Sequence, residues 1–150
     1  MFSFLPQKLK GTIILTLVIL NTLFWLPIMV MGALIKIVIP LPFVKKWISK
    51  ALIAGANNWV ALNSFVMFLF LKIDWVVSDI EGLSNNDWYF VNCNHQSWSD
   101  IPIVQKLLNR RIPMLKFFLK KELIWVPIIG ICWWALDFPF MKRSTAEEIK

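Results

Sequence analysis

Residues Asn94 to Asp100, with the sequence NHQSWSD, contain the only histidine of the chain and a carboxylate five positions after it. A neutral imidazole can accept a proton from an alcohol at neutral pH. A carboxylate on its second nitrogen fixes the tautomer and stabilises the imidazolium that forms. A metal site lacks a second histidine, and a catalytic triad that used Ser97 or Ser99 would be cramped. The residue types therefore suit His95 as a general base and Asp100 as its orienter, acting on a hydroxyl that the substrate brings.

His95 and Asp100 can meet only if a loop folds between them. Five positions turn through about 500° on a helix, so the two side chains would point roughly 140° apart, and on a strand they would face opposite sides. The sequence predicts a strand that ends near Asn94, then a loop, then a helix with Ser99 as its N-cap and Pro102 in the first turn. This places the histidine at the C-terminal end of a strand, where open α/β sheets bind ligands. The spacing alone is a weak signal, because a buried histidine or a chance loop explains each residue separately.

The composition indicates a membrane as the surroundings of this motif. The chain is 58% hydrophobic, above the roughly 45–50% of ordinary soluble domains, and the excess lies mostly in the first half. The net charge is +7, with lysines alternating with apolar blocks and no arginine before Arg110. This pattern favours an anionic membrane surface and argues against nucleic acid. Cys93 and Cys132 match no metal-ligand spacing, so we expect two buried thiols in a reducing compartment and no metal.

Two uncharged runs predict a membrane-anchoring helical hairpin in residues 1–72. The run from Gly11 to Ile35 exceeds the roughly 20 residues that span the hydrocarbon core. It is too long for a signal-peptide h-region, which favours a retained anchor. Pro27 would kink a spanning helix or form the bend of a re-entrant one.

The second run, from Ala51 to Leu71, follows a basic connector predicted from Lys36 to Lys50. The lysines of the connector place the C-terminal side in the cytoplasm by the positive-inside rule. Asparagines interrupt the run at Asn57, Asn58 and Asn63. A second span and an interfacial helix therefore stay equally open.

Residues 73–150 have a different texture and predict an α/β domain. The expected turn region is Glu81–Asp87, and the expected helix is Ile101–Asn109, while Pro127–Trp134 fits a helix or a loop. Strands are expected at Asp74–Asp79, Trp88–Asn92, Met114–Leu119 and Phe138–Met141. Alternating strands and helices favour an α/β fold, so the predicted fold class is a helical hairpin followed by an α/β domain.

Three ordered blocks of this half resemble a known family. Asn94-His95 with Asp100 resembles the NHx4D signature of the glycerolipid acyltransferases, in particular the bacterial 1-acyl-glycerol-3-phosphate acyltransferases. Downstream, the stretches FLKKEL (118–123) and WVPIIG (125–130) resemble the family's "KkEL…iPxxG" block. ALDFPFMKR (135–143) resembles its second motif, Gly-x-x-Phe-Ile-Asp-Arg. The combination is most similar to the YihG-like branch.

The resemblance implies a reaction and roles for named residues. In this family a histidine base deprotonates the free hydroxyl of a lysophospholipid, which attacks the thioester of an acyl-CoA or acyl carrier protein. Carried over, His95 is the base and Asp100 its orienter. Arg143 binds the acceptor phosphate, with Lys120 beside it. The expected partners are membrane lipid, the lysophospholipid acceptor and the acyl donor, with no separate cofactor. The expected location is the inner (cytoplasmic) membrane, with the catalytic part facing the cytoplasm.

The chain also departs from the family pattern. Asp137 stands where glycine is usual, and Lys142 stands where aspartate is usual, which bears on the acceptor's identity. The third motif, Glu-Gly-Thr/Ser-Arg, and a later proline motif are not found before Lys150. From this we expect residues 73–150 to be the N-terminal part of an acyltransferase domain. The alternative is a catalytically inactive, truncated fragment that binds membranes.

Overall fold

The computed structural model describes residues 5–94, 96–97 and 99–142, and it divides the chain into two compact units. The first unit comprises Met1–Trp25 and Ala56–Leu115, and the second comprises Leu26–Gly55 and Lys116–Lys150. Both long helices of the chain contribute one part to each unit. Each unit is therefore built around a pair of helix segments.

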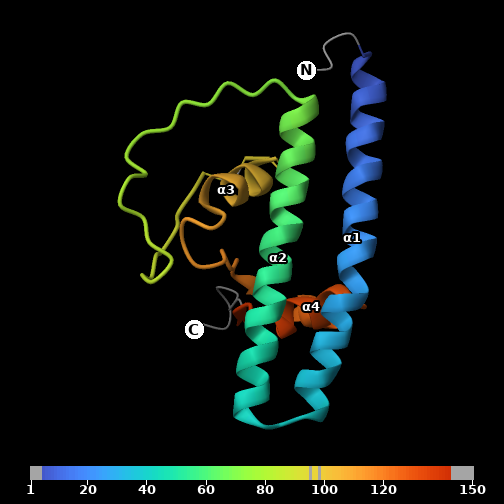
Figure 1. Cartoon of the computed structure of the whole chain (residues 1–150), viewed down its shortest axis with the longest axis vertical. Helices are drawn as coiled ribbons and strands as arrows, with labels where there is room; N and C mark the ends of the chain where they lie inside the picture. The colour runs from blue at the N-terminus through green and yellow to red at the C-terminus, as the bar shows by residue number, and fades with distance from the viewer. Residues whose placement is uncertain (1–4, 95, 98, 143–150) are drawn as a thin grey trace, which may run out of the picture. The chain divides into compact units, whose positions relative to one another are not determined.

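Helices α1 (Gln7–Val38) and α2 (Pro42–Phe70) form the predicted hairpin and lie side by side in opposite directions (Figure 1). Both are long and apolar enough to cross a membrane, judged by length and composition. α1 stays helical through Pro27, so the re-entrant bend is not formed. The predicted basic connector from Lys36 to Lys50 is wrong, because only residues 39–41 lie between the helices. Lysine is a good helix former, and α2 simply begins before its lysines.

In the first unit, polar side chains join the two helices. The Asn21 amide donates to the backbone carbonyl of Trp59 at 3.1 Å and to Oδ1 of Asn63 at 2.8 Å. The Trp59 indole donates to the Thr22 hydroxyl at 3.1 Å. Asn21 is buried, and hydrogen bonds of this kind between apolar helices contribute on the order of 0.6 kcal/mol each. They fix the register of α1 against α2 where apolar packing alone would let the helices slide.

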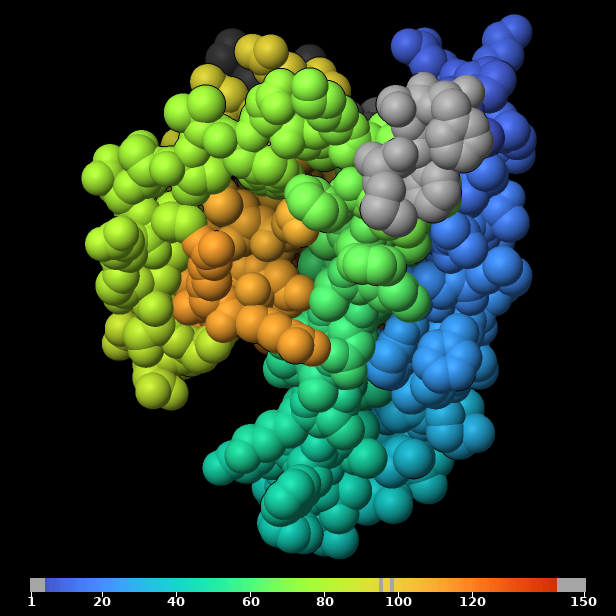
Figure 2. Space-filling model, turned by 45° about the horizontal axis from the view of Figure 1, so that its top comes forward, coloured from blue at the N-terminus to red at the C-terminus, as the bar shows by residue number. Residues whose placement is uncertain are grey.

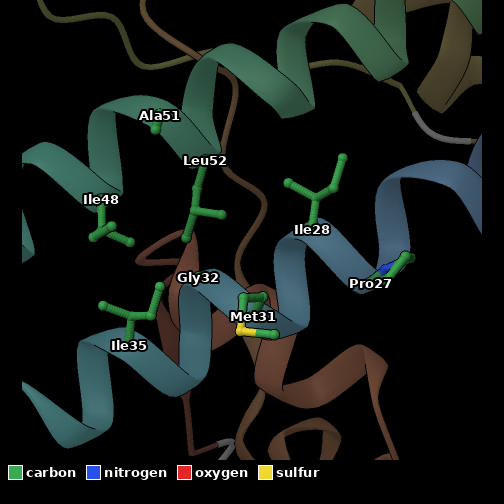
Figure 3. A pocket seen from close by; sticks show the side chains of 8 residues that line it. All are labelled: Pro27, Ile28, Met31, Gly32, Ile35, Ile48, Ala51 and Leu52. Carbon is green, nitrogen blue, oxygen red and sulfur yellow. The ribbon is translucent and has the colours of Figure 1, made fainter.

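In the second unit, small residues bring the helices close together. A Cβ on Gly32 would lie 2.5 Å from Cδ2 of Leu52, so a larger residue here would force the Leu52 side chain to shift. An apolar groove of about 450 Å³ lies beside the contact. Figure 3 shows Ile48 and Leu52 pointing from α2 toward the turns of α1 that carry Ile35 and Gly32.

Two predicted strands of the first unit are not formed. Residues 71–94 contain no strand, so the predictions at Asp74–Asp79 and Trp88–Asn92 are wrong. The segment is extended, and Figure 2 shows it as a yellow-green band along the outer surface of that unit. Val76 and Trp88 are exposed by 100% and 95%, respectively. Alternating β-branched and aromatic residues are favoured in strands, but a strand forms only where a neighbouring strand pairs with it.

The second unit contains a small strand–helix–strand element. Strands β1 (Leu119–Lys120) and β2 (Phe140–Met141) pair in parallel, and they are joined by the 3₁₀ helix η1 (Lys121–Trp125) and helix α4 (Ile129–Ala135). The strand predicted at Phe138–Met141 is confirmed in its second half, and α4 confirms the helical alternative for Pro127–Trp134. The strand predicted at Met114–Leu119 is wrong for all but its last residue. The α/β character is thus limited, within the described residues, to this element.

Candidate functional site

Gln96 and Ser97 contact Asp100, the first residue of helix α3 (Asp100–Leu108). Oδ2 of Asp100 accepts hydrogen bonds from the backbone N–H groups of Gln96 and Ser97, each at 2.7 Å. The Ser97 hydroxyl donates to Oδ1 at 3.3 Å. A fold-back just before a helix is the geometry that the sequence requires for His95 and Asp100 to meet, although the strand predicted to precede it is not formed. His95 itself lies outside the described residues, so its predicted contact with Asp100 stays a prediction.

Ser99 occupies the predicted N-cap position of α3 but does not cap it with its side chain. Its backbone angles are already helical, with φ −71° and ψ −20°. Its hydroxyl instead makes a short hydrogen bond with the Ser97 hydroxyl. Asp100 supplies a negative charge in the first turn, which complements the N-terminal end of the helix dipole. The carboxylate therefore closes the loop and favours the helix start at once.

The C-terminal end of α3 is fixed on the asparagines of α2. The Asn109 amide donates to the backbone carbonyl of Asn57 at 3.1 Å, and the Arg110 guanidinium donates to Oδ1 of Asn58. Lys106 lies 5.2 Å from the ring centroid of Phe68. Of the asparagines that interrupt the second apolar run, Asn58 thus uses its side chain to hold the end of α3, whereas Asn57 contributes its backbone carbonyl.

Lys120 lies in the second unit, on strand β1, and its side chain is exposed. The parallel register places Lys120 opposite Met141 of β2. Lys142 and Arg143 follow Met141 in the sequence, although Arg143 lies outside the described residues. The structure thus brings Lys120 alongside the strand of the second motif, and the phosphate-binding roles of Lys120 and Arg143 stay predictions.

Gly130, the last residue of the "iPxxG" block, sits at a point of close approach between η1 and α4. A Cβ at this position would overlap the backbone carbonyl of Ile124. Gly130 is buried, and its amide donates to the carbonyl of Val126 at 2.9 Å. The block therefore makes the tight connection that returns the chain to β2.

Asp137, where the family pattern has glycine, adopts a left-handed conformation with φ +58°. It follows the end of α4, a position that glycine takes most easily and that aspartate tolerates. Its carboxylate forms an ion pair with Lys36 at 2.8 Å. Sequence reasoning treated Lys36 as the end of an apolar run and the start of a basic connector. The charge at the end of that run was the one available signal, since nothing local connects it to a residue 101 positions away.

The cysteines differ from one another. Cys93 is exposed, which overturns the prediction that both are buried, because the segment before the loop does not enter a sheet. Cys132, on α4, is half-buried, and burial raises the pKa of its thiol. A raised pKa keeps Cys132 in the unreactive thiol form.

The acyltransferase family model matches residues 74–150, slightly more than half of the 150-residue chain. Comparisons with curated proteins and with solved structures found no match. The matched residues include the Asp100 loop, the strand–helix–strand element and all three blocks that resemble the glycerolipid enzymes. The match supports acyl transfer as the class of reaction. The chain belongs to the acyltransferase family.

Proposed function

We propose that the protein transfers a fatty acyl group from an acyl thioester to the free hydroxyl of a lysophospholipid, 1-acyl-glycerol-3-phosphate. The observation that carries the proposal is the loop closed on Asp100 inside the matched family range. These bonds fix the backbone of Gln96 and Ser97, which directly follow His95, the only histidine of the chain. The donor is an acyl-CoA or an acyl carrier protein.

His95 acts as the general base in this reaction. Its imidazole takes the proton of the acceptor hydroxyl while the oxygen attacks the thioester carbonyl carbon. The tetrahedral intermediate then collapses, the C–S bond breaks, and the imidazolium returns the proton to the leaving thiolate. Asp100 orients the imidazole and stabilises its charged form. The products are a diacylglycerol phosphate and a free thiol, so no redox partner or metal enters the balance.

The acceptor phosphate is bound by Lys120 and Arg143. A guanidinium binds a phosphate in a bidentate way, whereas an ammonium acts as a compact point charge. The exposure of Lys120 and its position opposite Met141 support this assignment. Lys142, in place of the usual aspartate, adds a third positive charge to this sequence and fits a doubly charged phosphate monoester.

The hairpin of α1 and α2 holds the enzyme at the membrane, at the cytoplasmic face of the inner membrane. An acceptor and a product with acyl tails stay in the bilayer, so the catalytic loop must work at its surface. α2 bonds α3 through Asn57 and Asn58 near its middle. If α2 spanned the bilayer, the Asn109 amide and the Arg110 guanidinium would lie near the hydrocarbon centre, where polar and charged groups are costly. This favours the interfacial placement of α2 over a second span.

The test is acyl transfer from radiolabelled palmitoyl-CoA to 1-oleoyl-glycerol-3-phosphate in detergent micelles. We expect His95→Ala to lower turnover by about 10²–10⁴-fold, the range of a general base. Undiminished turnover in His95→Ala, or wild-type protein that binds micelles but transfers nothing, would refute the assignment. The second result would leave the inactive membrane-binding fragment.

The same assay separates phosphate binding from general charge. Lys120→Ala should raise the KM for the lysophospholipid roughly tenfold, about 1.4 kcal/mol, with kcat nearly unchanged. Lys121→Ala removes the same charge one position later, from an exposed residue of η1, and serves as the matched control. Equal effects of the two substitutions would reduce Lys120 to a contributor of surface charge.

A further inference from the structure

A buried lysine at the end of α1 is joined to the chain segment that precedes β2. Lys36 is only 5% exposed. Its ammonium donates to the carbonyl of Ala135 at 2.7 Å and to Oδ1 of Asp137 at 2.8 Å, and it lies 5.5 Å from the ring centroid of Trp134. The donors of the ammonium are thus directed at the C-terminal end of α4 and the residue that follows it. All these groups lie in the second unit.

Asp137, the acidic partner of Lys36, uses both of its carboxylate oxygens. The second carboxylate oxygen of Asp137 accepts a hydrogen bond from the Ser49 hydroxyl of α2 at 3.2 Å. Asp137 therefore contacts both helices of the hairpin, α1 through Lys36 and α2 through Ser49. Its side chain is 52% exposed. Exposure lowers the energy of such a pair but leaves its geometry intact.

The backbone of Asp137 adds a second observation. A non-glycine residue at φ +58° is strained relative to glycine. Nothing in the backbone of this turn requires aspartate, because glycine would end α4 without the strain. The carboxylate is the only thing that aspartate adds at this position, and it is directed at the hairpin.

The chain after Asp137 leads directly into the proposed phosphate site. Phe138 and Pro139 follow it, and the carbonyl of Pro139 accepts a hydrogen bond from the backbone N–H of Leu119 at 3.0 Å. β2 then pairs with β1, where Lys120 stands. A shift of Asp137 would therefore displace the strand of the second motif relative to Lys120.

We propose that Lys36 and Asp137 are positioning residues, which fix the second-motif strand against the hairpin and so set the geometry of the phosphate site. The positioning itself stands on the contacts above, and its effect on the acceptor rests on the proposed function. The lysine acts through Asp137 and β2, and it does not touch the substrate.

The experiment uses the full chain in detergent micelles and two readouts. The first is hydrogen exchange of the Leu119 amide, which reports pairing between the β1 and β2 segments without any activity. The second is the KM and kcat for 1-oleoyl-glycerol-3-phosphate. The variants are Lys36→Met, Lys36→Arg and Asp137→Gly. Lys50→Met is the matched control, because Lys50 lies on α2 in the same unit and its ammonium rests over the Trp47 ring, outside the Asp137 cluster.

We expect Lys36→Met and Asp137→Gly to speed exchange at Leu119 at least tenfold and to raise KM roughly tenfold, with kcat within about twofold of wild type. Lys36→Arg, which keeps a cation, should restore most of both, and Lys50→Met should change neither. Asp137→Gly is decisive if Lys36→Met fails to fold, since glycine suits the backbone there. Wild-type exchange and KM in Asp137→Gly would overturn the proposal. If the wild-type chain transfers nothing to this acceptor, the proposed function fails, and the exchange at Leu119 alone decides the positioning role.

Discussion

Asp100 has two tasks that a single carboxylate can perform together. Its Oδ2 receives two backbone N–H groups, which closes the loop that follows His95. The same side chain is the proposed orienter of the imidazole. Charge-assisted hydrogen bonds to a carboxylate are stronger than neutral ones, so the loop and the charge support each other.

Substitution of Asp100 should separate the two tasks. Asp100→Asn keeps an oxygen that can accept the N–H groups of Gln96 and Ser97, so their amide exchange should remain slow. Asp100→Ala leaves both exposed donors to water, and their exchange should become fast. Acyl transfer should fall by about 10²–10⁴-fold in both variants, because neither retains the negative charge. Wild-type transfer in Asp100→Asn would limit Asp100 to closing the loop.

At this scale the sequence predicts local arrangements and misses distant ones. The spacing of His95 and Asp100 required a loop followed by a helix, and the structure forms that loop, because its partners lie within four positions of one another. The pair of Lys36 and Asp137 could not be predicted in the same way. Its partners are 101 positions apart, and only the fold brings them together. For the left-handed conformation of Asp137, the one indication in the sequence was that the family's second motif has glycine at this position.

At the scale of elements, helices and strands differ in how far the sequence determines them. The hairpin helices follow from two long uncharged runs, and α3 follows from local signals around Asp100, because helix hydrogen bonds join residues four apart. Strands at Asp74–Asp79 and Trp88–Asn92 were predicted from alternation and are not formed. Their pairing depends on distant chain segments, which the alternation does not specify.

The connection between η1 and α4 gives a test at this scale. Gly130→Ala would force a methyl group onto the carbonyl of Ile124, so a backbone shift must follow. We expect a loss of about 1–3 kcal/mol in stability, the usual range for overpacking, and a lower midpoint of thermal unfolding by circular dichroism.

Gly11→Ala is the matched control for this substitution. Its Cβ would meet nothing within 4 Å, and alanine favours the α1 helix by up to about 1 kcal/mol. An unfolding midpoint that falls equally in both variants would show that the effect is not the contact with Ile124.

For the whole molecule, the balance between apolar burial and charge would decide how the proposed hairpin anchor holds a membrane. Exposed apolar side chains lie along both helices, among them Leu20, Phe24 and Phe65. Burial in lipid stabilises by about 25 cal/mol per Å² of apolar surface. Lysines such as Lys45 and Lys46 add attraction to anionic lipid that salt screens.

Membrane extraction tests this balance. We expect 1 M salt, where the screening length is about 3 Å, to leave the full chain in the membrane fraction, and detergent to release it. Deletion of residues 1–72 should give a chain that no longer sediments with membranes. Release of the full chain by 1 M salt would contradict anchoring by the hairpin and leave a peripheral, electrostatic attachment.

The short connection at residues 39–41 has a consequence for sidedness. Because α1 and α2 lie antiparallel and are bonded to each other through Asn21 and Trp59, the start of α1 and the end of α2 belong to the same end of the hairpin. The chain cannot thread one helix across a bilayer and leave its partner behind without breaking those bonds. If the hairpin anchors the protein, the start of α1 and the segment that leads to the Asp100 loop should therefore face the same compartment, whether the hairpin crosses the bilayer or lies in one leaflet. A reporter fused ahead of α1 would disclose the compartment that the Asp100 loop faces.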